Sequence, residues 1–307
     1  MRTLFVPSLL CVVSACSQPL LDQYVLDGDD LFPEGITFDT SRQAFVVGSL
    51  EHGRLTSIDA DGTQRVLFED DVEGDWAISG VKYDSAGDNV WACANTMSGE
   101  AQAGSEIWQV HVPTADLVRH DLSDAGTQTP RCNDLVLGPD AAYVTDSQSP
   151  YIYRIPSGGT AEVFATHEDF HGTFVGMNGL DITADGVLLA ARFRPAALFR
   201  VPLNDGADIH QVDLSGAEFE GKSPFSGADG LIFLGATLYV TMDARMLLLD
   251  SDDGWSTATV RHIEMQPGLS TATVADDAVY AVKSEVVKHV LRTPPELPFA
   301  IVRVPQP

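Results

Sequence analysis

The sequence is poor in cationic side chains: 18 Lys and Arg stand against 44 Asp and Glu in 307 residues, a formal net charge of −26. Only four lysines occur, and they are widely separated, at Lys82, Lys222, Lys283 and Lys288. Proteins that bind phosphate backbones or anionic membrane surfaces do so through clusters of Lys and Arg. The composition therefore excludes those two classes, and we predict no nucleic-acid partner.

Long apolar runs are also lacking, so no segment is predicted to span a membrane. The apolar run over residues 4–13 is too short for that and fits the core of a signal peptide. It ends in VSAC at residues 13–16, where small residues directly precede a Cys, as in the lipobox of bacterial lipoproteins. We predict a signal peptide over 1–15 and a lipidated N-terminus at Cys16. The protein would then be exported to the periplasm or cell envelope and held at the membrane only by this lipid anchor. An ordinary signal peptide cut nearby and a buried N-terminal strand are the alternatives.

Cysteine is scarce as well. Beyond the leader only Cys93 and Cys132 remain, without further Cys or His at ligand spacing, which excludes a thiolate metal site. The two thiols could form one disulfide in an oxidising compartment or be two small buried apolar residues. The sequence favours the second interpretation.

What the sequence does contain is a repeat. Short apolar strand-like runs alternate with turns rich in Gly, Asp, Pro and Ser, which is typical of an all-β protein. Similar phrases recur as PEGITFD, ISGVKYD, CNDLVLG, MNGLDIT and ADGLIFL, with a weaker copy in LSTATVADDAVYAV. The equivalent positions in the six copies are Glu34, Ser79, Asn133, Asn178, Asp229 and Ser270. They are separated by 45, 54, 45, 51 and 41 residues.

This spacing is that of a four-stranded propeller blade. Radial closure protects the sheet edges, whereas a solenoid would need polar caps at both ends. We therefore predict one six-bladed β-propeller over residues 31–307, with four-stranded antiparallel blades around a central channel. Residues 16–30 precede it, and Tyr24 to Leu26 are expected to pair into the last blade and close the ring.

Four of the equivalent positions carry side-chain oxygens suited to a hard cation. The innermost strands of all blades begin at the same face, so these positions converge on the axis. They are Glu34, Asn133, Asn178 and Asp229, called the tetrad below. Two carboxylates and two carboxamides suit Ca²⁺, Mg²⁺ or Mn²⁺ better than a thiophilic metal, although such residues could also merely line a wet channel.

With these motifs the chain resembles the gluconolactonase, regucalcin and luciferin-regenerating family of six-bladed propellers, and more distantly diisopropylfluorophosphatase and paraoxonase. The resemblance rests on PEG, RCND, MNGL and ADGL and covers nearly all of the mature chain. It implies that the tetrad binds one catalytic divalent cation, with Ca²⁺ preferred over Mg²⁺, Mn²⁺ or Zn²⁺. It also implies that Asp229 is a base or nucleophile and that Arg131 contacts the substrate. A structural ion pair is the alternative for Arg131. Ser79 and the weak sixth repeat do not extend the ligand set, and a long insertion from Asn95 to Ser105 leaves the identity of the substrate open.

One motif points to different chemistry. His167-Glu168-Asp169-Phe170-His171 matches the HExxH pattern of zinc proteases, but that geometry needs a helix, and Gly172 follows immediately. We expect a loop on the tetrad face instead, either solvated or at the pocket rim together with Trp76, Phe174 and Phe225. Asp146, at the end of a strand, is expected to support the site from behind.

Together these observations predict a monomeric, exported, metal-dependent hydrolase acting on a small-molecule lactone or ester, most simply a gluconolactonase-like lactonase. A cation held by two carboxylates and two neutral amides keeps positive charge, which suits polarisation of a carbonyl oxygen. The main alternative is a non-catalytic propeller that uses the cation structurally and binds a ligand or protein partner. A phosphotriesterase-like or strictosidine-synthase-like activity is a further alternative, since propellers host many functions.

Overall fold

The computed structural model describes residues 18–70, 75–96, 104–127 and 129–306. The predicted signal peptide and Cys16 lie outside the described residues, as does most of the insertion between Asn95 and Ser105. None of the helices in the described ranges has the length and apolar character needed to cross a membrane.

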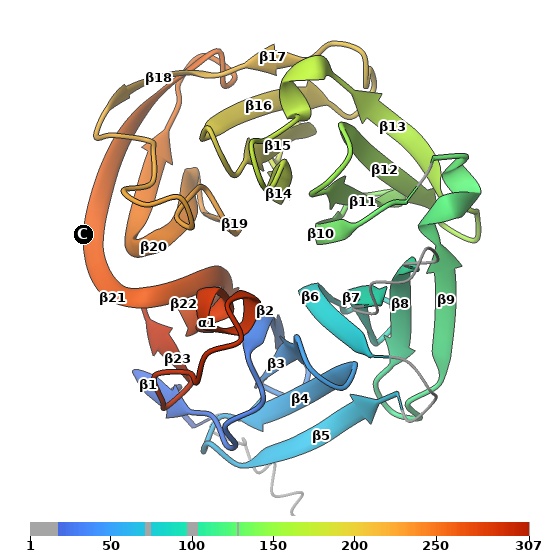
Figure 1. The fold of residues 1–307 in the computed structure, drawn as a ribbon, viewed down its shortest axis with the longest axis vertical. Helices are drawn as coiled ribbons and strands as arrows, with labels where there is room; N and C mark the ends of the chain where they lie inside the picture. Colours follow the sequence, from blue (N-terminus) through green and yellow to red (C-terminus); the bar gives the residue numbers. More distant parts are fainter. Residues whose placement is uncertain (1–17, 71–74, 97–103, 128, 307) are drawn as a thin grey trace, which may run out of the picture.

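Strands radiate from a central axis in six groups, which confirms the predicted six-bladed propeller (Figure 1). The first four blades are separate sheets of four antiparallel strands, ordered in space as in the chain. Blade 1 consists of β2 Pro33–Asp39, β3 Ala44–Ser49, β4 Arg54–Asp59 and β5 Gln64–Glu69. Blade 2 consists of β6 Trp76–Asp84, β7 Asn89–Thr96, β8 Ser105–His111 and β9 Leu117–Asp121. Blade 3 consists of β10 Cys132–Leu137, β11 Ala141–Asp146, β12 Tyr151–Pro156 and β13 Glu162–Thr166. Blade 4 consists of β14 Met177–Ile182, β15 Val187–Arg192, β16 Ala197–Pro202 and β17 His210–Gln211.

Blades 5 and 6 depart from this regular pattern because two long strands join them into one sheet. The strands of this sheet are β18 Asp213–Gly216, β19 Leu231–Leu234, β20 Thr237–Asp250, β21 Thr257–Ala275, β22 Ala278–Lys283, β23 Ala300–Arg303 and β1 Gln23–Val25. β21 pairs with β20 through residues 259–264 and with β22 through residues 269–275. It therefore runs from the rim of blade 5 to the axis of blade 6, as the long curved strand in Figure 1 shows. β18 pairs with β21 in parallel, an exception to the predicted antiparallel order.

The ring is closed by the two ends of the described chain. β1 pairs with β23, with Tyr24 opposite Ile301, so the N-terminal segment supplies the outer strand of blade 6 as predicted for residues 24–26. The seam is filled by aromatic rings: Phe45 lies 5.2 Å from Tyr24 and 4.9 Å from Tyr280 between ring centroids. Such tilted ring pairs add to the free energy gained by burying their area, which stabilises the closed ring.

The inner and outer strands of a blade differ in how deeply their residues are buried. β2, at the axis, is buried along its whole length, whereas β5, at the rim of the same blade, has no fully buried residue. Inner strands are covered on both faces by neighbouring blades, so their polar residues are buried as well, as Glu34, Thr37 and Asp39 of β2 are. The hydrophobic core lies between adjacent blades, and the axis is left to polar residues.

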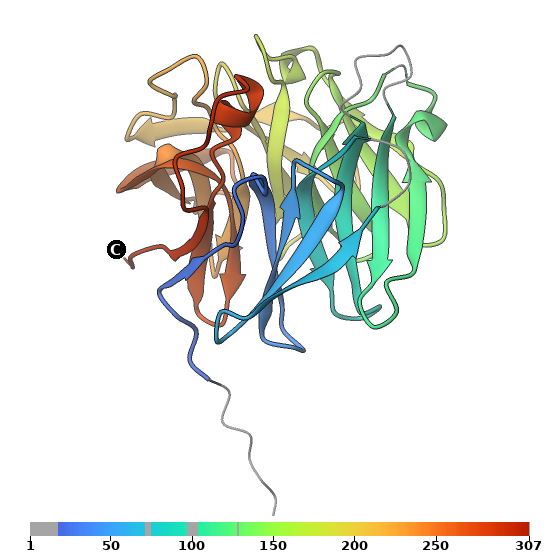
Figure 2. The ribbon, with the colours of Figure 1, turned by 60° about the horizontal axis from the view of Figure 1, so that its bottom comes forward.

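Helical structure is confined to loops. The helices are η1 Leu122–Ala125, η2 Glu168–Phe170 and α1 Val286–Val290. α1 follows β22, which ends at the face where the innermost strand of blade 6 begins. Figure 2 shows α1 at one face of the propeller. His289 of α1 contacts Glu51 at 2.9 Å, which ties this loop to blade 1. α1 thus lies on the face where the tetrad was expected.

Candidate metal centre

The innermost strands are irregular at the same place in five blades. Pairing with the second strand shifts register between Pro33 and Ile36 in blade 1. Equivalent shifts occur at the start of the inner strands of blades 2, 3, 4 and 6. A bulge inserts an unpaired residue and re-aims its side chain. In blades 1, 3 and 4 the bulge falls at the tetrad residue, the second residue of the repeat, and this residue lines the channel mouth.

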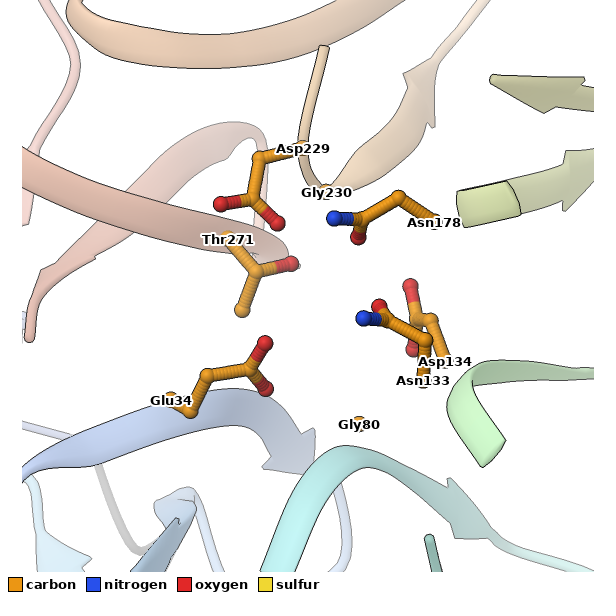
Figure 3. A pocket seen from close by; sticks show the side chains of 8 residues that line it. All are labelled: Glu34, Gly80, Asn133, Asp134, Asn178, Asp229, Gly230 and Thr271. Carbon is orange, nitrogen blue, oxygen red and sulfur yellow. The ribbon is translucent and has the colours of Figure 1, made fainter. Parts of the chain in front are cut away.

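All four tetrad residues line one small cavity at this mouth, with about 160 Å³ of empty space. Figure 3 shows the carboxylates of Glu34 and Asp229 and the amides of Asn133 and Asn178 directed toward a common centre. The cavity is completed by Gly80, Asp134, Gly230 and Thr271. The fold therefore brings together residues up to 195 positions apart in the chain, from Glu34 to Asp229, at the positions that the repeat predicted.

The two carboxylates of the tetrad are strongly perturbed by their surroundings. Burial raises the pKa of Glu34 well above its usual range, and repulsion from Asp229 and Asp134 adds to this. Burial and repulsion from Asp134 likewise raise the pKa of Asp229, while a hydrogen bond from Asn178 lowers it. A cation placed among these groups would relieve both desolvation and mutual repulsion.

The amides supply the second sign of a cation site. Asn133 Oδ1 is buried and accepts no hydrogen bond. A buried acceptor without a partner costs free energy, so a group that binds it is expected. Within the described ranges no three His, Cys, Asp or Glu side chains are grouped to hold a metal, so carboxamides must take part in any site here. The donor set, two carboxylates and two amides, fits a hard divalent cation.

Asp134 lines the tetrad cavity but was not predicted from the sequence repeat. Its Oδ1 accepts a hydrogen bond from Leu135 N at 2.8 Å, while Oδ2 is buried without a partner. Burial is the main cause that raises its pKa to about 6. The blade alignment held a usable signal, because this position is Gly in four of the other repeats and Asp only here. Thr271 occupies the same position in blade 6.

Glycines at this position, called the waist, allow the innermost strands of neighbouring blades to approach one another closely. A Cβ on Gly80 would lie 2.6 Å from Asp134 Cα, and one on Gly179 would lie 2.6 Å from Leu231 N. A Cβ on Gly230 would lie 2.6 Å from Thr271 Cα. Hydrogen bonds cross the same contacts, from Gly179 N to Asp229 O at 3.1 Å and from Gly230 N to Ser270 O at 3.1 Å. Only glycine permits this approach of neighbouring strands, which positions the tetrad backbones relative to one another.

The loop that carries Asp229 is held from the side of blades 4 and 5. Arg194 binds Glu220 at 3.0 Å and the carbonyls of Gly221, Ser223 and Ser226. Arg245, which is buried, donates to Glu220 O at 2.8 Å. Sequence reasoning did not identify these two arginines, because their partners, Glu220 and several backbone carbonyls, belong to an irregular loop.

Arg131 and Asp146 lie beside the cavity, and neither is among its lining residues. Asp146 is buried and accepts hydrogen bonds from Tyr153 OH at 2.9 Å and from Gln148 N at 2.8 Å. It also accepts one from Arg131 N at 3.3 Å. Asp146 therefore orders the loop behind Asn133. The substrate contact predicted for the Arg131 side chain remains a prediction.

The HExxH segment is not helical in the way that a zinc protease requires. η2 has three residues, and His167 Nδ1 accepts from Asp169 N at 3.2 Å, which caps it. Of the expected rim aromatics, Phe174 and Phe225 are exposed, with ring centroids 6.4 Å apart. Trp76 is buried against Trp108 at 5.0 Å, so it belongs to the core.

Cys93 and Cys132 are both free and buried, as the sequence favoured. Burial, followed by a hydrogen bond with Cys132, raises the pKa of the Cys93 thiol well above its usual range. They therefore act as small buried groups between blades 2 and 3, directly behind Asn133.

No protein-family model matches the sequence. No curated protein matches it either. Solved structures do match over nearly the whole chain. One is the major allergen Mala s 1 of Malassezia sympodialis, with a TM-score of 0.75, 16% identity and coverage of 93% of this chain and 96% of the allergen. A gluconolactonase from Xanthomonas campestris matches with a TM-score of 0.66 and 17% identity, covering 92% of this chain and 89% of its own. Virginiamycin B lyase from Staphylococcus aureus matches with a TM-score of 0.57 and 14% identity, covering 84% and 94%.

The fold resemblance to gluconolactonase-type propellers is thus confirmed. An allergen, a lactonase and a lyase share the fold, so at these identities the fold does not select the reaction. The function has to be argued from the cavity.

Proposed function

We propose that this protein is an exported, divalent-metal-dependent hydrolase that opens small lactones, with the tetrad as its metal site. The observation that carries the proposal is the convergence of two buried carboxylates and two amides, one with an unpartnered oxygen, on one cavity at the channel mouth. The gluconolactonase among the fold neighbours supports the same reaction class.

Glu34 and Asp229 would bind the cation through their charged carboxylate oxygens, and Asn133 and Asn178 would bind it through their neutral amide oxygens. Bound there, a hard cation such as Ca²⁺ supplies a Lewis acid that polarises the lactone carbonyl. Asp229 has two roles open to it: it takes a proton from the attacking water, or its carboxylate attacks the carbonyl carbon. Asn178, hydrogen-bonded to Asp229, orients that carboxylate.

A lactone panel tests the proposal. Purified protein is analysed for bound metal, stripped with chelator and assayed with sugar and aliphatic lactones before and after Ca²⁺, Mg²⁺, Mn²⁺ or Zn²⁺ is restored. We expect turnover that is lost with the metal and recovered with it. Metal-loaded protein that opens no lactone, ester or phosphotriester would show the hydrolase proposal to be wrong.

A single turnover in H₂¹⁸O separates the two roles of Asp229. If Asp229 is a base, the label enters the hydroxy acid directly. If it is a nucleophile, its attack forms a mixed anhydride, and water that attacks the Asp229 carbonyl carbon leaves its label in the Asp229 carboxylate and none in the first product. Label in Asp229 therefore identifies the nucleophile, whereas water attack on the substrate acyl carbon labels the product as a base mechanism does. Mass spectrometry of the peptide that contains Asp229 distinguishes the outcomes.

The second candidate is a non-catalytic propeller that uses the cation as a structural brace. It is favoured by the size of the cavity, about 160 Å³, because small-molecule sites usually enclose roughly 300–1,000 Å³. In that case metal stabilises the fold without any turnover, and the same lactone panel decides between the two.

Lipid anchoring at Cys16 is the cellular part of the proposal. Cys16→Ala should leave the protein without an acyl group and released from the membrane fraction, whereas Cys93→Ala should leave anchoring unchanged. Mass spectrometry of the mature N-terminus checks this, and an unacylated wild-type N-terminus elsewhere would contradict it. Size-exclusion chromatography with light scattering tests the expected monomer.

A further inference from the structure

The end of the channel opposite to the tetrad contains a second cavity, with about 550 Å³ of empty space. Every blade contributes the residue that lies three positions after its tetrad-equivalent residue. These residues are Thr37, Lys82, Val136, Asp181, Ile232 and Thr273. The waist glycines come one residue after the tetrad-equivalent positions and two residues before the residues of this second cavity.

Lys82 is the cationic group of this cavity. Lys283 and Lys288 contact Glu285 and Glu296 at 3.4 and 2.9 Å. Lys82, in contrast, has no carboxylate within 4.0 Å among the described residues, although its charge acts on Asp181 and Asp134 from further away. Lys222, which is exposed, likewise has no carboxylate within 4.0 Å among the described residues, but Lys82 is the lysine that lines this cavity.

The other polar groups of the cavity are hydroxyls able to donate. Thr37 Oγ1 accepts a hydrogen bond from Tyr83 N at 2.9 Å, so its own hydrogen is left to donate. Thr273 presents a second hydroxyl. Asp181 is the carboxylate of this cavity, and part of its acceptor capacity is used within the protein, by Ile182 N at 2.9 Å and Phe233 N at 2.7 Å. The groups of this cavity that can donate a hydrogen bond to a ligand are therefore Lys82, Thr37 and Thr273. They lie between apolar side chains such as Val136 and Ile232.

We propose that this cavity binds a small organic monocarboxylate, with its carboxylate on Lys82, Thr37 and Thr273 and its hydrocarbon part on Val136 and Ile232. About 230 Å³ of this cavity admits a water-sized molecule, which suits a small ligand held between apolar walls and a few polar groups. The nearby carboxylates of Asp134 and Asp181 disfavour a dianion such as phosphate, whereas one negative charge matches the one ammonium.

Benzoate titrated into metal-free protein by calorimetry tests the site, with benzamide as the neutral control. Lys82→Met keeps the chain length and removes the charge, so we expect affinity for benzoate to fall by about tenfold or more. Lys82→Arg should retain binding. Thr273→Val, which removes one hydroxyl, should weaken it by about threefold to tenfold.

Asp229→Asn serves as the control for the other end of the channel and should leave benzoate binding intact. Melting curves first show that each variant is folded, and Thr273→Val tests the site independently if Lys82→Met does not fold. The proposal is overturned if wild type does not bind millimolar benzoate, if benzamide binds equally well, or if folded Lys82→Met retains full affinity. Loss of binding in Asp229→Asn, with Lys82→Met unaffected, would place benzoate at the tetrad instead.

Discussion

The two ends of the central channel are built from the same innermost strands but present opposite chemistry. At the mouth, Glu34, Asn133 and Asp229 direct oxygen acceptors into a small cavity. Three residues further along the same strands, Thr37, Lys82 and Thr273 direct donors into a wider one. The comparison shows how a propeller makes two sites from one scaffold, since a bulge and a ring of glycines separate two sets of positions that converge on the axis.

The largest expected effect concerns the mouth alone. Asp229→Asn keeps the size and one oxygen of the side chain but removes the charge, so lactone turnover at saturating metal should fall by about 10²–10⁴-fold. Asp243→Asn, at an exposed carboxylate of the same blade, should leave turnover unchanged. Steady-state kinetics with both variants check this. Turnover near wild type in Asp229→Asn would contradict the proposed mechanism.

Asp134 should make the free energy of unfolding depend on pH. Its native pKa is about 6 against 3.8 in the unfolded chain, because burial disfavours the carboxylate. The native state therefore binds the proton more tightly, and this contribution to stability is complete below pH 4 and lost as pH rises through 6. In metal-free protein Asp134→Asn should raise the free energy of unfolding by roughly 3 kcal/mol at pH 8 and change it little at pH 4.

Urea denaturation at both pH values measures this difference. Asp277→Asn, at an exposed carboxylate, provides the matched control. A stabilisation by Asp134→Asn that is the same at pH 4 and pH 8 would show that the carboxylate is not buried as the structure has it.

Removal of metal should act on the mouth and spare the opposite end. If the cation binds only the native state, a free concentration 100 times its dissociation constant adds about 2.7 kcal/mol. For a chain of this length that corresponds to a shift in Tm of roughly 4–5 °C on chelation. The shift should be smaller in Asp229→Asn and unchanged in Lys82→Met. An equal shift in all three proteins would place the cation elsewhere.

The smallest effect tests the waist that keeps the two ends apart. Gly179→Ala would set a Cβ against Leu231 N and Asp229 O, so it should destabilise the fold by about 1–3 kcal/mol, as overpacking does. At Gly159 the nearest atoms belong to the side chain of Pro156, at 3.2 Å or more, so Gly159→Ala should cost less. Urea denaturation compares the two. A Gly179→Ala protein as stable as Gly159→Ala would contradict the close approach of the strands.

The sequence by itself determined the fold class, the six repeats and the four tetrad positions. It could do so because each blade repeats one local pattern, and the symmetry of a closed ring turns equal positions in the repeat into neighbours at the axis. The strands PEGITFD and YIYRIP, read from alternation and turn residues, match β2 and β12 residue for residue.

Only the tertiary structure decided what lies beside the tetrad. In blade 3 the bulge places Asp134, the residue after Asn133, at the axis as well, which a strict two-residue alternation does not predict, and so Asp134 was missed. The partnership of Arg194 and Arg245 with loop carbonyls, the merging of blades 5 and 6 through β21, and the gathering of Lys82, Thr37 and Thr273 depend on contacts between distant segments. Local sequence specifies which residues a strand exposes, but the closing of the ring specifies which of them meet.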